Sequence, residues 1–164
     1  MGRRFRIVLP LAAVIVVLDQ VTKYIITQAL PLGGGRVVID GFFNLVHVLN
    51  TGAAFSFLAD QDGEWRRWLF VGLSCLAVVL IIYLVRLTHK ASLLLLLGFG
   101  SVLGGAVGNL VDRVRTGEVV DFLDFYLGSN HWPAFNVADT GISVGAAALI
   151  LAYFRMPKET TDDH

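Results

Sequence analysis

The sequence predicts an all-α integral membrane protein with four transmembrane helices and a small β-sheet outside the membrane. Its composition indicates this class, because 55% of the 164 residues are hydrophobic, 16% are charged and the mean hydropathy is +0.69. A soluble domain has about 25% charged residues. Four segments are long and apolar enough to cross the hydrocarbon core, which takes about 20 helical residues. We expect one membrane-embedded domain over residues 1–164.

The four predicted spans differ in where they carry charge. They cover about residues 7–28, 68–85, 91–111 and 136–154. The first contains Asp19 and Lys23 in its second half, the second and third contain no charged residue, and the fourth contains only Asp139, in its first turn. Because charge within a span is costly, these three residues need a structural or a functional reason.

The N-terminus has the basic start and apolar run of a secretory signal peptide, but no small-residue cleavage site follows it. We therefore predict that it remains as the first span. Four spans place both termini on one side of the membrane. Arg3, Arg4 and Arg6 directly precede the first span, which favours a cytoplasmic location for both termini.

The long connection between the first two spans is predicted to form the sheet. It contains RVVIDGFFNLVHVLN, in which β-branched and aromatic residues flank Asp40 and Gly41. An Asp-Gly pair between apolar runs is a hairpin signal. We expect a β region over about residues 36–57, near the membrane interface on the outer side. Residues 112–135 are predicted to form a second outer loop.

Small residues recur in the last two spans at the spacing of helix–helix contacts. They are Gly100, Gly104 and Gly108 in the third span, and Gly141 and Gly145 in the fourth. Such spacing lets helices approach closely in lipid. We expect each of these spans to have a close helical neighbour, and each is the natural candidate for the other.

Asp121 and Asp139 differ from the other acids because each lies in apolar sequence, VVDFLDF and AFNVADTGI. Partial desolvation raises the pKa of a carboxyl group, and a second carboxyl nearby raises one member of the pair further. Such a pair can share a proton, activate water with one member and protonate the leaving amine with the other. Spacing alone leaves open whether the two acids are catalytic or are solvated at helix ends.

Other chemistries have weaker support. The sequence has no H-E-x-x-H motif. Its G-x-S-x-G match, GISVG from Gly141, lies within the fourth predicted span and not at the strand-to-helix turn that presents a nucleophilic serine in hydrolases. Its four histidines are scattered, at His47, His89, His131 and His164. No metal or other cofactor is therefore expected. A Ser56–Lys23 dyad stays open as an alternative. Asp19 and Lys23 are either a structural ion pair or part of a site, and Asp124 is interpreted as a solvated loop acid.

Two carboxyl groups that activate water and protonate a leaving amine would hydrolyse a peptide bond, but other function classes also stay open at this point. Carboxylates within a membrane mark ion or proton pathways in transporters, although the second and third spans have no charge along their length. A lipid-binding assembly protein without chemistry is a third possibility. The formal net charge is zero, so no basic surface indicates a nucleic-acid partner.

Five motifs, in order along almost the whole chain, resemble the lipoprotein signal peptidase (signal peptidase II) family. They are LDQVTK in the first span, NTGAAFS from Asn50, GGAVGNLVDR from Gly104, VVDF from Val119 and PAFNVADTGISVG from Pro133. The departures are small: Thr140 stands where Ser is also common, and residues 123–132 do not resemble a family motif.

The resemblance implies a bacterial inner-membrane aspartyl endopeptidase, blocked by the antibiotic globomycin. It would cleave prolipoproteins directly before a diacylglyceryl-modified cysteine, at the outer leaflet, with four transmembrane helices and an extracytoplasmic β-sheet cradle. The family's catalytic aspartates correspond to Asp121 and Asp139. Site-supporting or substrate-binding roles would fall to Asp19, Lys23, Asn50, Gly52, Gly108, Asn109, Asp112, Arg113, Asn136 and Ala138.

Three further expectations follow from the resemblance. Phe42, Phe43 and Phe55 are candidates for contacting the substrate from the sheet. Arg113 is expected to fix Asp112 or the following loop. The partners are the lipid-modified prolipoprotein and membrane lipids, and a monomer is sufficient because all motif residues come from one chain.

Overall fold

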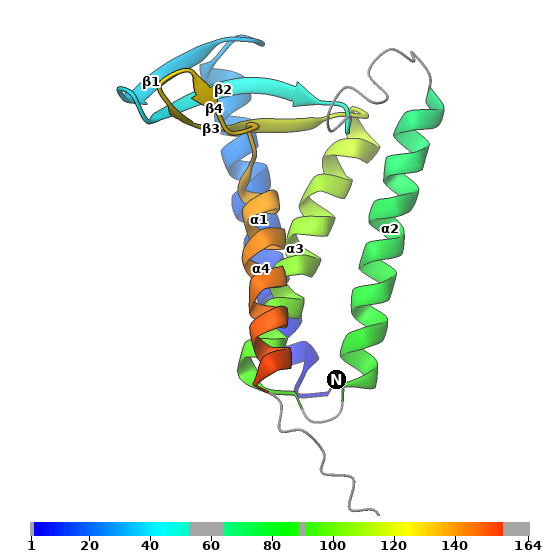
Figure 1. Ribbon diagram of the computed structural model, residues 1–164. Coiled ribbons are helices and arrows are strands. Elements are labelled where there is room, and N and C mark those ends of the chain that lie inside the picture. Colours follow the sequence, from blue (N-terminus) through cyan, green and yellow to red (C-terminus); the bar gives the residue numbers. More distant parts are fainter. Residues whose placement is uncertain (1, 53–63, 89–90, 156–164) are drawn as a thin grey trace, which may run out of the picture.

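The computed structural model describes residues 2–52, 64–88 and 91–155. Its helices are α1 (Phe5–Ala29), α2 (Glu64–Leu87), α3 (Leu93–Arg115) and α4 (Val137–Phe154). All four are long and apolar enough to cross a membrane, which confirms the predicted number of spanning helices. Figure 1 shows the helices side by side, with a small sheet across one end of the bundle.

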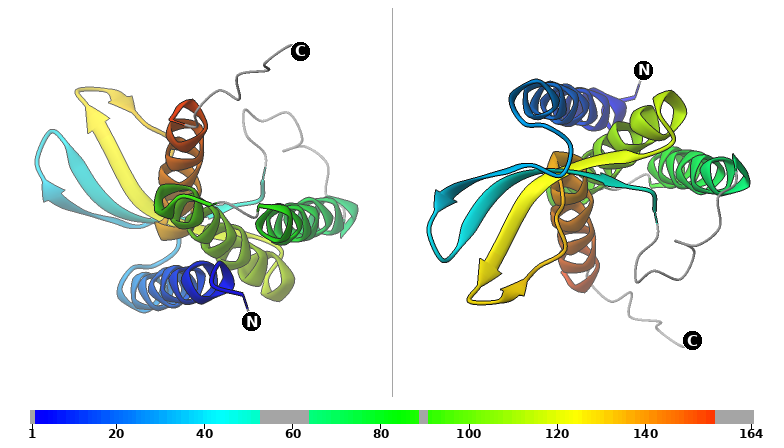
Figure 2. Two further views of the ribbon diagram at one scale, coloured as in Figure 1. Left: turned by 90° about the horizontal axis from the view of Figure 1, so that it is seen from below. Right: turned by 90° about the horizontal axis from the view of Figure 1, so that it is seen from above.

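α3 is the central helix of the bundle. Figure 2 shows α1, α2 and α4 arranged around it. In the most apolar 18-residue stretch of α3, 61% of the residues are buried inside the protein. The corresponding shares for α1, α2 and α4 are 17%, 11% and 22%. Apolar side chains on the outer helices, such as Leu76 and Val144, are more than half exposed. These three helices therefore present the apolar surface that a bilayer requires.

Glycines on α3 allow both α1 and α4 to pack closely against it. A Cβ atom on Gly104 would lie 2.8 Å from Cβ of Ile15 and 2.9 Å from the carbonyl oxygen of Ala12, both on α1. On the opposite side, a Cβ atom on Gly105 would overlap the carbonyl oxygen of Ala138 on α4. The expected close contact between the last two spans is confirmed. The predicted glycine stripe of the third span, however, faces α1 over most of its length.

Arg4 ties the start of α1 to the end of α2. Its Nη1 atom donates to the backbone carbonyls of Val85, Arg86 and Thr88, at 3.0, 2.7 and 2.6 Å. A helix leaves its last carbonyls without partners, and positive charge is favourable at that end. The N-terminal residues and the end of α4 lie together at the end of the bundle opposite the sheet (Figure 1).

The sheet has four antiparallel strands, in the order β1 (Gly35–Ile39), β2 (Phe43–Asn50), β3 (Val119–Leu127) and β4 (Asn130–His131). β1 and β2 form the predicted hairpin, and Gly41 in its turn has φ of +75°, which glycine adopts without strain. The sheet is a single layer that projects sideways from the helices (Figure 1). Residues 53–57 of the predicted β region lie outside the described residues.

The prediction of a loop over residues 112–135 is wrong. α3 continues to Arg115, so Asp112 lies in its last turns, and β3 follows after a short connection. Asp121 and Asp124 have hydrogen-bonding partners on β2 and are buried. The sheet is therefore larger than predicted, and β3 carries one of the two candidate catalytic residues.

We predict that Gly105→Ala destabilises the protein. Its new methyl group would overlap the backbone of Ala138, which cannot rotate away as a side chain could, and overpacking of this kind costs about 1–3 kcal/mol. Thermal unfolding in detergent, followed by tryptophan fluorescence, should show a lower midpoint. Gly72→Ala on α2 is the matched control, because no atom lies within 4 Å of the added Cβ. An unchanged midpoint for Gly105→Ala would contradict the packing described above.

Candidate active site

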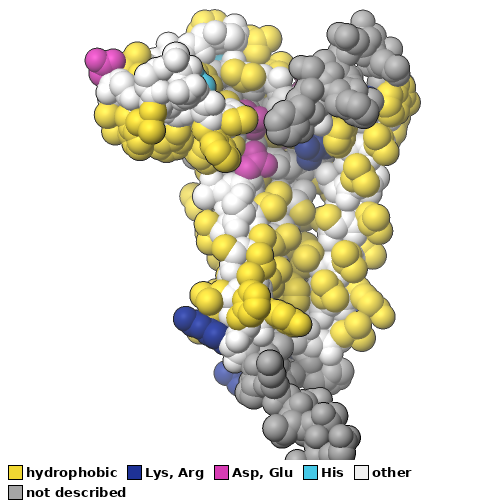
Figure 3. Space-filling view, viewed as in Figure 1, with side chains coloured by type: hydrophobic (Ala, Val, Ile, Leu, Met, Phe, Trp, Pro, Cys, Tyr) yellow, Lys and Arg dark blue, Asp and Glu magenta, His cyan; other side chains and the backbone are white. Residues whose placement is uncertain are grey.

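The candidate site lies where the sheet meets the ends of α3 and α4. Figure 3 shows acidic side chains gathered beneath the sheet at this level, above the apolar surface of the helices. β3 contributes Asp121, α4 contributes Asp139 and α3 contributes Asn109. The two aspartates, eighteen residues apart in sequence, are thus brought into one polar cluster by the packing of α4 on α3 and of β3 across their ends.

Asp121 is almost completely buried, with 2% of its surface exposed. Asn136 donates to its Oδ1 atom at 2.7 Å, and Asn50 donates to its Oδ2 atom at 2.9 Å. Burial raises the pKa of Asp121 to about 6, and the charge of Asp139 contributes in the same direction, whereas the hydrogen bonds from the two asparagines lower it. Asp121 therefore holds a proton more readily than an ordinary aspartic acid.

Asp139 is held by the capping of α4. Asn136 is the N-cap residue: its Oδ1 atom accepts from the backbone N–H of Asp139 at 2.9 Å, and Asp139 accepts from the backbone N–H of Asn136 at 3.4 Å. This reciprocal capping box satisfies two N–H groups that a helix start leaves without partners. The other carboxylate oxygen of Asp139 accepts from Asn109 at 2.7 Å.

Asn109 and Asn136 connect the two aspartates. Asn136 donates through Nδ2 to Asp121 and, at 3.3 Å, to the Oδ1 atom of Asn109. Asn109 in turn donates through Nδ2 to Asp139. The amides are 4% and 0% exposed, so they have no water to turn toward. The two carboxylates are consequently held by one connected set of hydrogen bonds.

Behind Asn109 lies an ion cluster, here called the Lys23 cluster and consisting of Asp19, Lys23 and Asp112. Lys23 Nζ is 2.8 Å from Asp19 and 2.7 Å from Asp112, and it donates to Asn109 at 3.1 Å. All three members are buried. Gly108 is required beside the cluster, because a Cβ atom there would lie 2.8 Å from Asp19 Oδ2.

Gln20 also belongs beside this cluster, although the sequence did not mark it as a site residue. Its Nε2 atom donates to Asp112 Oδ1 at 2.9 Å and lies 3.2 Å from Asp19 Oδ2. The available signal was its place in the LDQVTK motif, next to Asp19 on a face of α1 that also carries Lys23.

Arg113 forms no ion pair with Asp112, although the charges of Asp139, Asp112 and Asp121 all act on its guanidinium group. Lys23 and Gln20 are the side-chain partners of Asp112. The Arg113 guanidinium turns instead toward α2, where it lies over the ring of Phe70 at 5.6 Å and contacts Ser74 Oγ at 3.4 Å. Arg113 therefore joins α3 to α2 at the level of the aspartates.

Gly52 fixes the end of β2 next to Asp121. Its φ is +88°, and a Cβ atom would lie 2.5 Å from the ring of Phe70, so only glycine fits there. Its backbone N–H donates to Asn50 Oδ1 at 2.8 Å. The opposite end of the same amide then faces Asp121.

Asp124 is not a solvated loop acid, and that interpretation is wrong. It lies within β3, is 7% exposed, and accepts hydrogen bonds from His131 at 2.8 Å and from Asn44 at 2.9 Å. Although burial opposes ionisation, these two hydrogen bonds hold the pKa of Asp124 below its usual value. The side chain of His131 also stacks on Tyr126. Asp124 thus fastens β4 to β3 and β2.

The remaining sequence candidates fall into two groups. Phe42 and Phe43 pack against Phe125 in the sheet, with ring centroids 5.4 and 4.7 Å apart. Phe55, Ser56, His89 and His164 lie outside the described residues. Within the described residues, no group of three His, Cys, Asp or Glu side chains could hold a metal ion.

Comparisons with known proteins decide the family. A family model described as "Signal peptidase (SPase) II" matches residues 11–155. This chain belongs to the signal peptidase II family. It is 50% identical to a lipoprotein signal peptidase of Nitratidesulfovibrio vulgaris over 94% of this chain and 93% of that protein, and 48% identical to one of Oleidesulfovibrio alaskensis over 94% and 99%.

A solved structure supports the same conclusion. A bacterial membrane enzyme determined by the in meso method superposes with a TM-score of 0.80 and 30% identity, over 95% of this chain and 92% of that one. The predicted family is therefore confirmed. Its members are membrane peptidases of the aspartic type that remove the signal peptides of lipoproteins. The roles of the individual residues remain predictions.

We predict that Asp124 stabilises the sheet in a pH-dependent way. Because its pKa is lower in the folded protein than in the unfolded chain, its contribution is present above the unfolded pKa, about 3.9, and is lost as pH falls through the folded value. Asp124→Asn should lower the midpoint of thermal unfolding at pH 7, and the difference from wild type should shrink toward pH 3. Asp40→Asn, in the exposed hairpin turn, is the control and should change little. A deficit independent of pH would contradict this role.

Proposed function

We propose that this chain removes signal peptides from diacylglyceryl-modified prolipoproteins by cleaving the peptide bond directly before the lipid-modified cysteine. Asp121 and Asp139 are the catalytic residues. The observation that carries the proposal is the pair itself: two carboxylates from different elements, joined through Asn109 and Asn136, with the pKa of Asp121 raised to about 6. Membership of a family of aspartic-type peptidases supports the same chemistry.

The two aspartates have different roles in proton transfer. Asp121, which is the more deeply buried, is the proton donor, and Asp139, which accepts hydrogen bonds at both oxygens, is the general base. Asp139 takes a proton from water, whose oxygen attacks the scissile carbonyl carbon, and Asp121 protonates the carbonyl oxygen. Asp139 then passes its proton to the amide nitrogen as the C–N bond breaks, and one hydroxyl of the tetrahedral intermediate returns a proton to Asp121. The products are a carboxylic acid and the free amine of the cysteine.

A pocket of about 390 Å³ opens beside Asp139 and supports substrate binding there. Its walls come from residues 132–135 and from the first turns of α4, including Thr140, Ser143 and Val144. The lining is mostly apolar. A lipid-modified substrate held along the apolar helices would therefore present its peptide to the aspartates at the edge of the membrane, and binding energy from the lipid would position the scissile bond.

The proposal also includes an orientation of the chain in the membrane. The chain is a multi-pass protein of the bacterial cytoplasmic membrane, with both termini in the cytoplasm and the sheet and active site at the outer leaflet. The start of α1 lies at the end of the bundle opposite the sheet (Figure 1), and the basic residues Arg3, Arg4 and Arg6 surround that start, which supports this orientation. A monomer suffices, because every residue of the described site comes from one chain.

We predict that Asp121→Asn and Asp139→Asn each reduce cleavage by about 10²–10⁴-fold, the range for loss of a general acid or base. The assay is release of signal peptide from a diacylglyceryl-modified prolipoprotein by purified protein in detergent. Asp124→Asn is the matched control and should stay active, because its partners lie in the sheet.

Three results would contradict parts of this proposal. Full activity in either Asp121→Asn or Asp139→Asn would mean that the catalytic pair is misassigned. Equal cleavage of an unmodified prolipoprotein would remove the proposed positioning by lipid. Folded wild-type protein that releases no signal peptide would contradict the peptidase function itself.

We also predict an alkaline limb in the pH profile of kcat/KM, which reports groups in the free enzyme. Activity should fall as pH rises through the pKa of Asp121, about 6, because the proton that it donates is lost. The hydrogen bond from Asn50 lowers this pKa, so Asn50→Ala should move the limb to higher pH. A limb that stays in place, or moves to lower pH, would show that Asp121 is not the proton donor.

A further inference from the structure

Each proposed catalytic aspartate follows a residue whose backbone N–H is held by a buried carboxylate. Ala138, which precedes Asp139, donates its N–H to Asp19 Oδ1 at 2.9 Å. Val120, which precedes Asp121, donates its N–H to Asp112 Oδ2 at 3.4 Å. The two contacts are alike although the acids come from α1 and α3 and the donors from α4 and β3. Each one sets the position of the main chain next to a reacting carboxylate.

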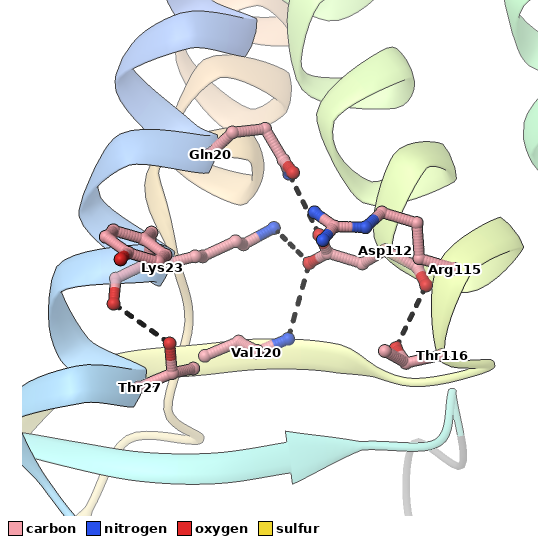
Figure 4. Close-up of a pocket in the computed structure, with 8 residues that line it drawn as sticks. Gln20, Lys23, Thr27, Asp112, Arg115, Thr116 and Val120 are labelled. Atoms are coloured by element: carbon pink, nitrogen blue, oxygen red, sulfur yellow. Dashed lines mark hydrogen bonds and ion pairs between the residues drawn. The ribbon is translucent and has the colours of Figure 1, made fainter.

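Both of these carboxylates meet on one ammonium group. Lys23 Nζ lies 2.8 Å from Asp19 Oδ2 and 2.7 Å from Asp112 Oδ2. Figure 4 shows the Lys23 side chain reaching from α1 to Asp112 on α3, and Asp112 reaching on to the backbone of Val120. The backbone positions beside the two aspartates are therefore connected through a single atom.

A third hydrogen bond of the Lys23 ammonium group connects it to the aspartates through Asn109. Lys23 Nζ donates to Asn109 Oδ1 at 3.1 Å. An ammonium group can only donate, so this contact fixes which end of the Asn109 amide faces Lys23. The opposite end, Nδ2, must then face Asp139, to which it donates at 2.7 Å. Asn109 Oδ1 also accepts from Asn136, the donor to Asp121.

Stability alone is a poor reason for such a cluster. Lys23, Asp19 and Asp112 are 4%, 0% and 8% exposed, and the desolvation of buried ion pairs commonly cancels their attraction. Two carboxylates on one lysine also leave a net negative charge. This arrangement fixes the orientation of the groups around it. Three acceptors from α1 and α3 surround the Nζ atom of Lys23, which has one proton for each of them.

We propose that Lys23 is a positioning residue that sets the spacing of Asp121 and Asp139. It acts through Asp112 on the backbone of β3, through Asp19 on the first turn of α4, and through Asn109 on the Asp139 carboxylate. This inference rests on the proposed function, in that spacing matters only if both aspartates react with one peptide bond. It differs from a structural ion pair in its prediction, since removal of Lys23 should slow the chemical step in protein that is still folded.

The test compares Lys23→Met, Lys23→Arg and Arg115→Met with wild type, all as full-length protein in detergent. Arg115 is the matched control because it lines the same pocket of about 230 Å³ seen in Figure 4, yet it is exposed and makes none of the contacts described above. Cleavage of a diacylglyceryl-modified prolipoprotein gives kcat and KM, and thermal unfolding shows whether each variant is folded.

Lys23→Met should lower kcat by about 100-fold, the effect of misplacing a reacting group by about 1 Å, with KM within about threefold of wild type. The positive charge of Lys23 lowers the pKa of Asp121, so this variant should also move the alkaline limb to higher pH. Lys23→Arg keeps the charge and should keep the limb in place. Its kcat should still fall by about tenfold, since a planar guanidinium cannot direct its donors as an ammonium group does. Arg115→Met should match wild type in both measurements.

The proposal is overturned if folded Lys23→Met keeps kcat within about threefold of wild type, or if only its KM changes. Should Lys23→Met fail to fold, the double variant Lys23→Met/Asp112→Asn removes one of the carboxylates left without its cation. Reduced kcat in the folded double variant supports positioning, and wild-type kcat overturns it. Wild-type kcat in folded Lys23→Arg overturns it as well. Absence of cleavage by wild type, in contrast, counts against the proposed function.

Discussion

The start of α4 is the constraint on which the site depends. A helix that begins inside a protein must find partners for its first N–H groups, and here Asn136, Asp139 and Asp19 supply them. The same groups belong to the candidate site: Asp139 is a proposed catalytic residue, Asn136 donates to Asp121, and Asp19 is part of the Lys23 cluster. The capping of the helix and the alignment of the aspartates are thus achieved by the same atoms. A change that loosens the cap would move the proposed catalytic pair.

Close helix packing makes that capping possible. Asp19 can reach the backbone of α4 only because Gly108 leaves room between α1, α3 and α4; a Cβ atom there would lie 2.8 Å from the carboxylate and 3.2 Å from Ala138. Gly105 similarly admits the main chain of Ala138. The glycines of α3, which the sequence marks only as packing residues, therefore determine how near the polar groups of three helices can come.

The sequence predicted the features that depend on local composition. The four spans follow from apolar length, the β1–β2 hairpin follows from Asp40–Gly41, and Asp121 and Asp139 were identifiable because an acid in apolar sequence is unusual. Features that depend on pairing across the chain were missed. β3 was predicted as part of an outer loop because its pairing partner, β2, is distant in sequence. Nothing near Asp121 in sequence indicates that Asn50, seventy-one residues away, would satisfy it.

The departures from expectation at Asp124 and Arg113 have the same physical origin. Sequence context shows whether a charged side chain is surrounded by apolar neighbours, but it does not show which partner will neutralise it. Arg113 is next to Asp112 in sequence, yet successive helical residues point in different directions. The side chain of Lys23, on another helix, points toward Asp112 and pairs with it, whereas the side chain of Arg113 turns to Phe70 and Ser74.

The location of the aspartates explains why so many polar groups surround them. β3 and α4 are separate elements, and the sheet is a single layer joined to the helices mainly through its strand ends (Figure 1). Nothing within either element alone fixes the distance between Asp121 and Asp139. Contacts that cross between elements must do so: Asn136 from α4 to β3, Asn109 from α3 to α4, and the Lys23 cluster from α1 to all three.

Such a network is costly to desolvate, but it has one property that apolar packing lacks. Hydrogen bonds between charged and amide groups specify direction as well as distance. The proposed reaction, in which two carboxylates exchange protons across one peptide bond, depends on both. The helices present apolar surface on one side of the candidate site, and the sheet on the other side is a single layer. Buried polar contacts between elements are therefore the means of holding that geometry.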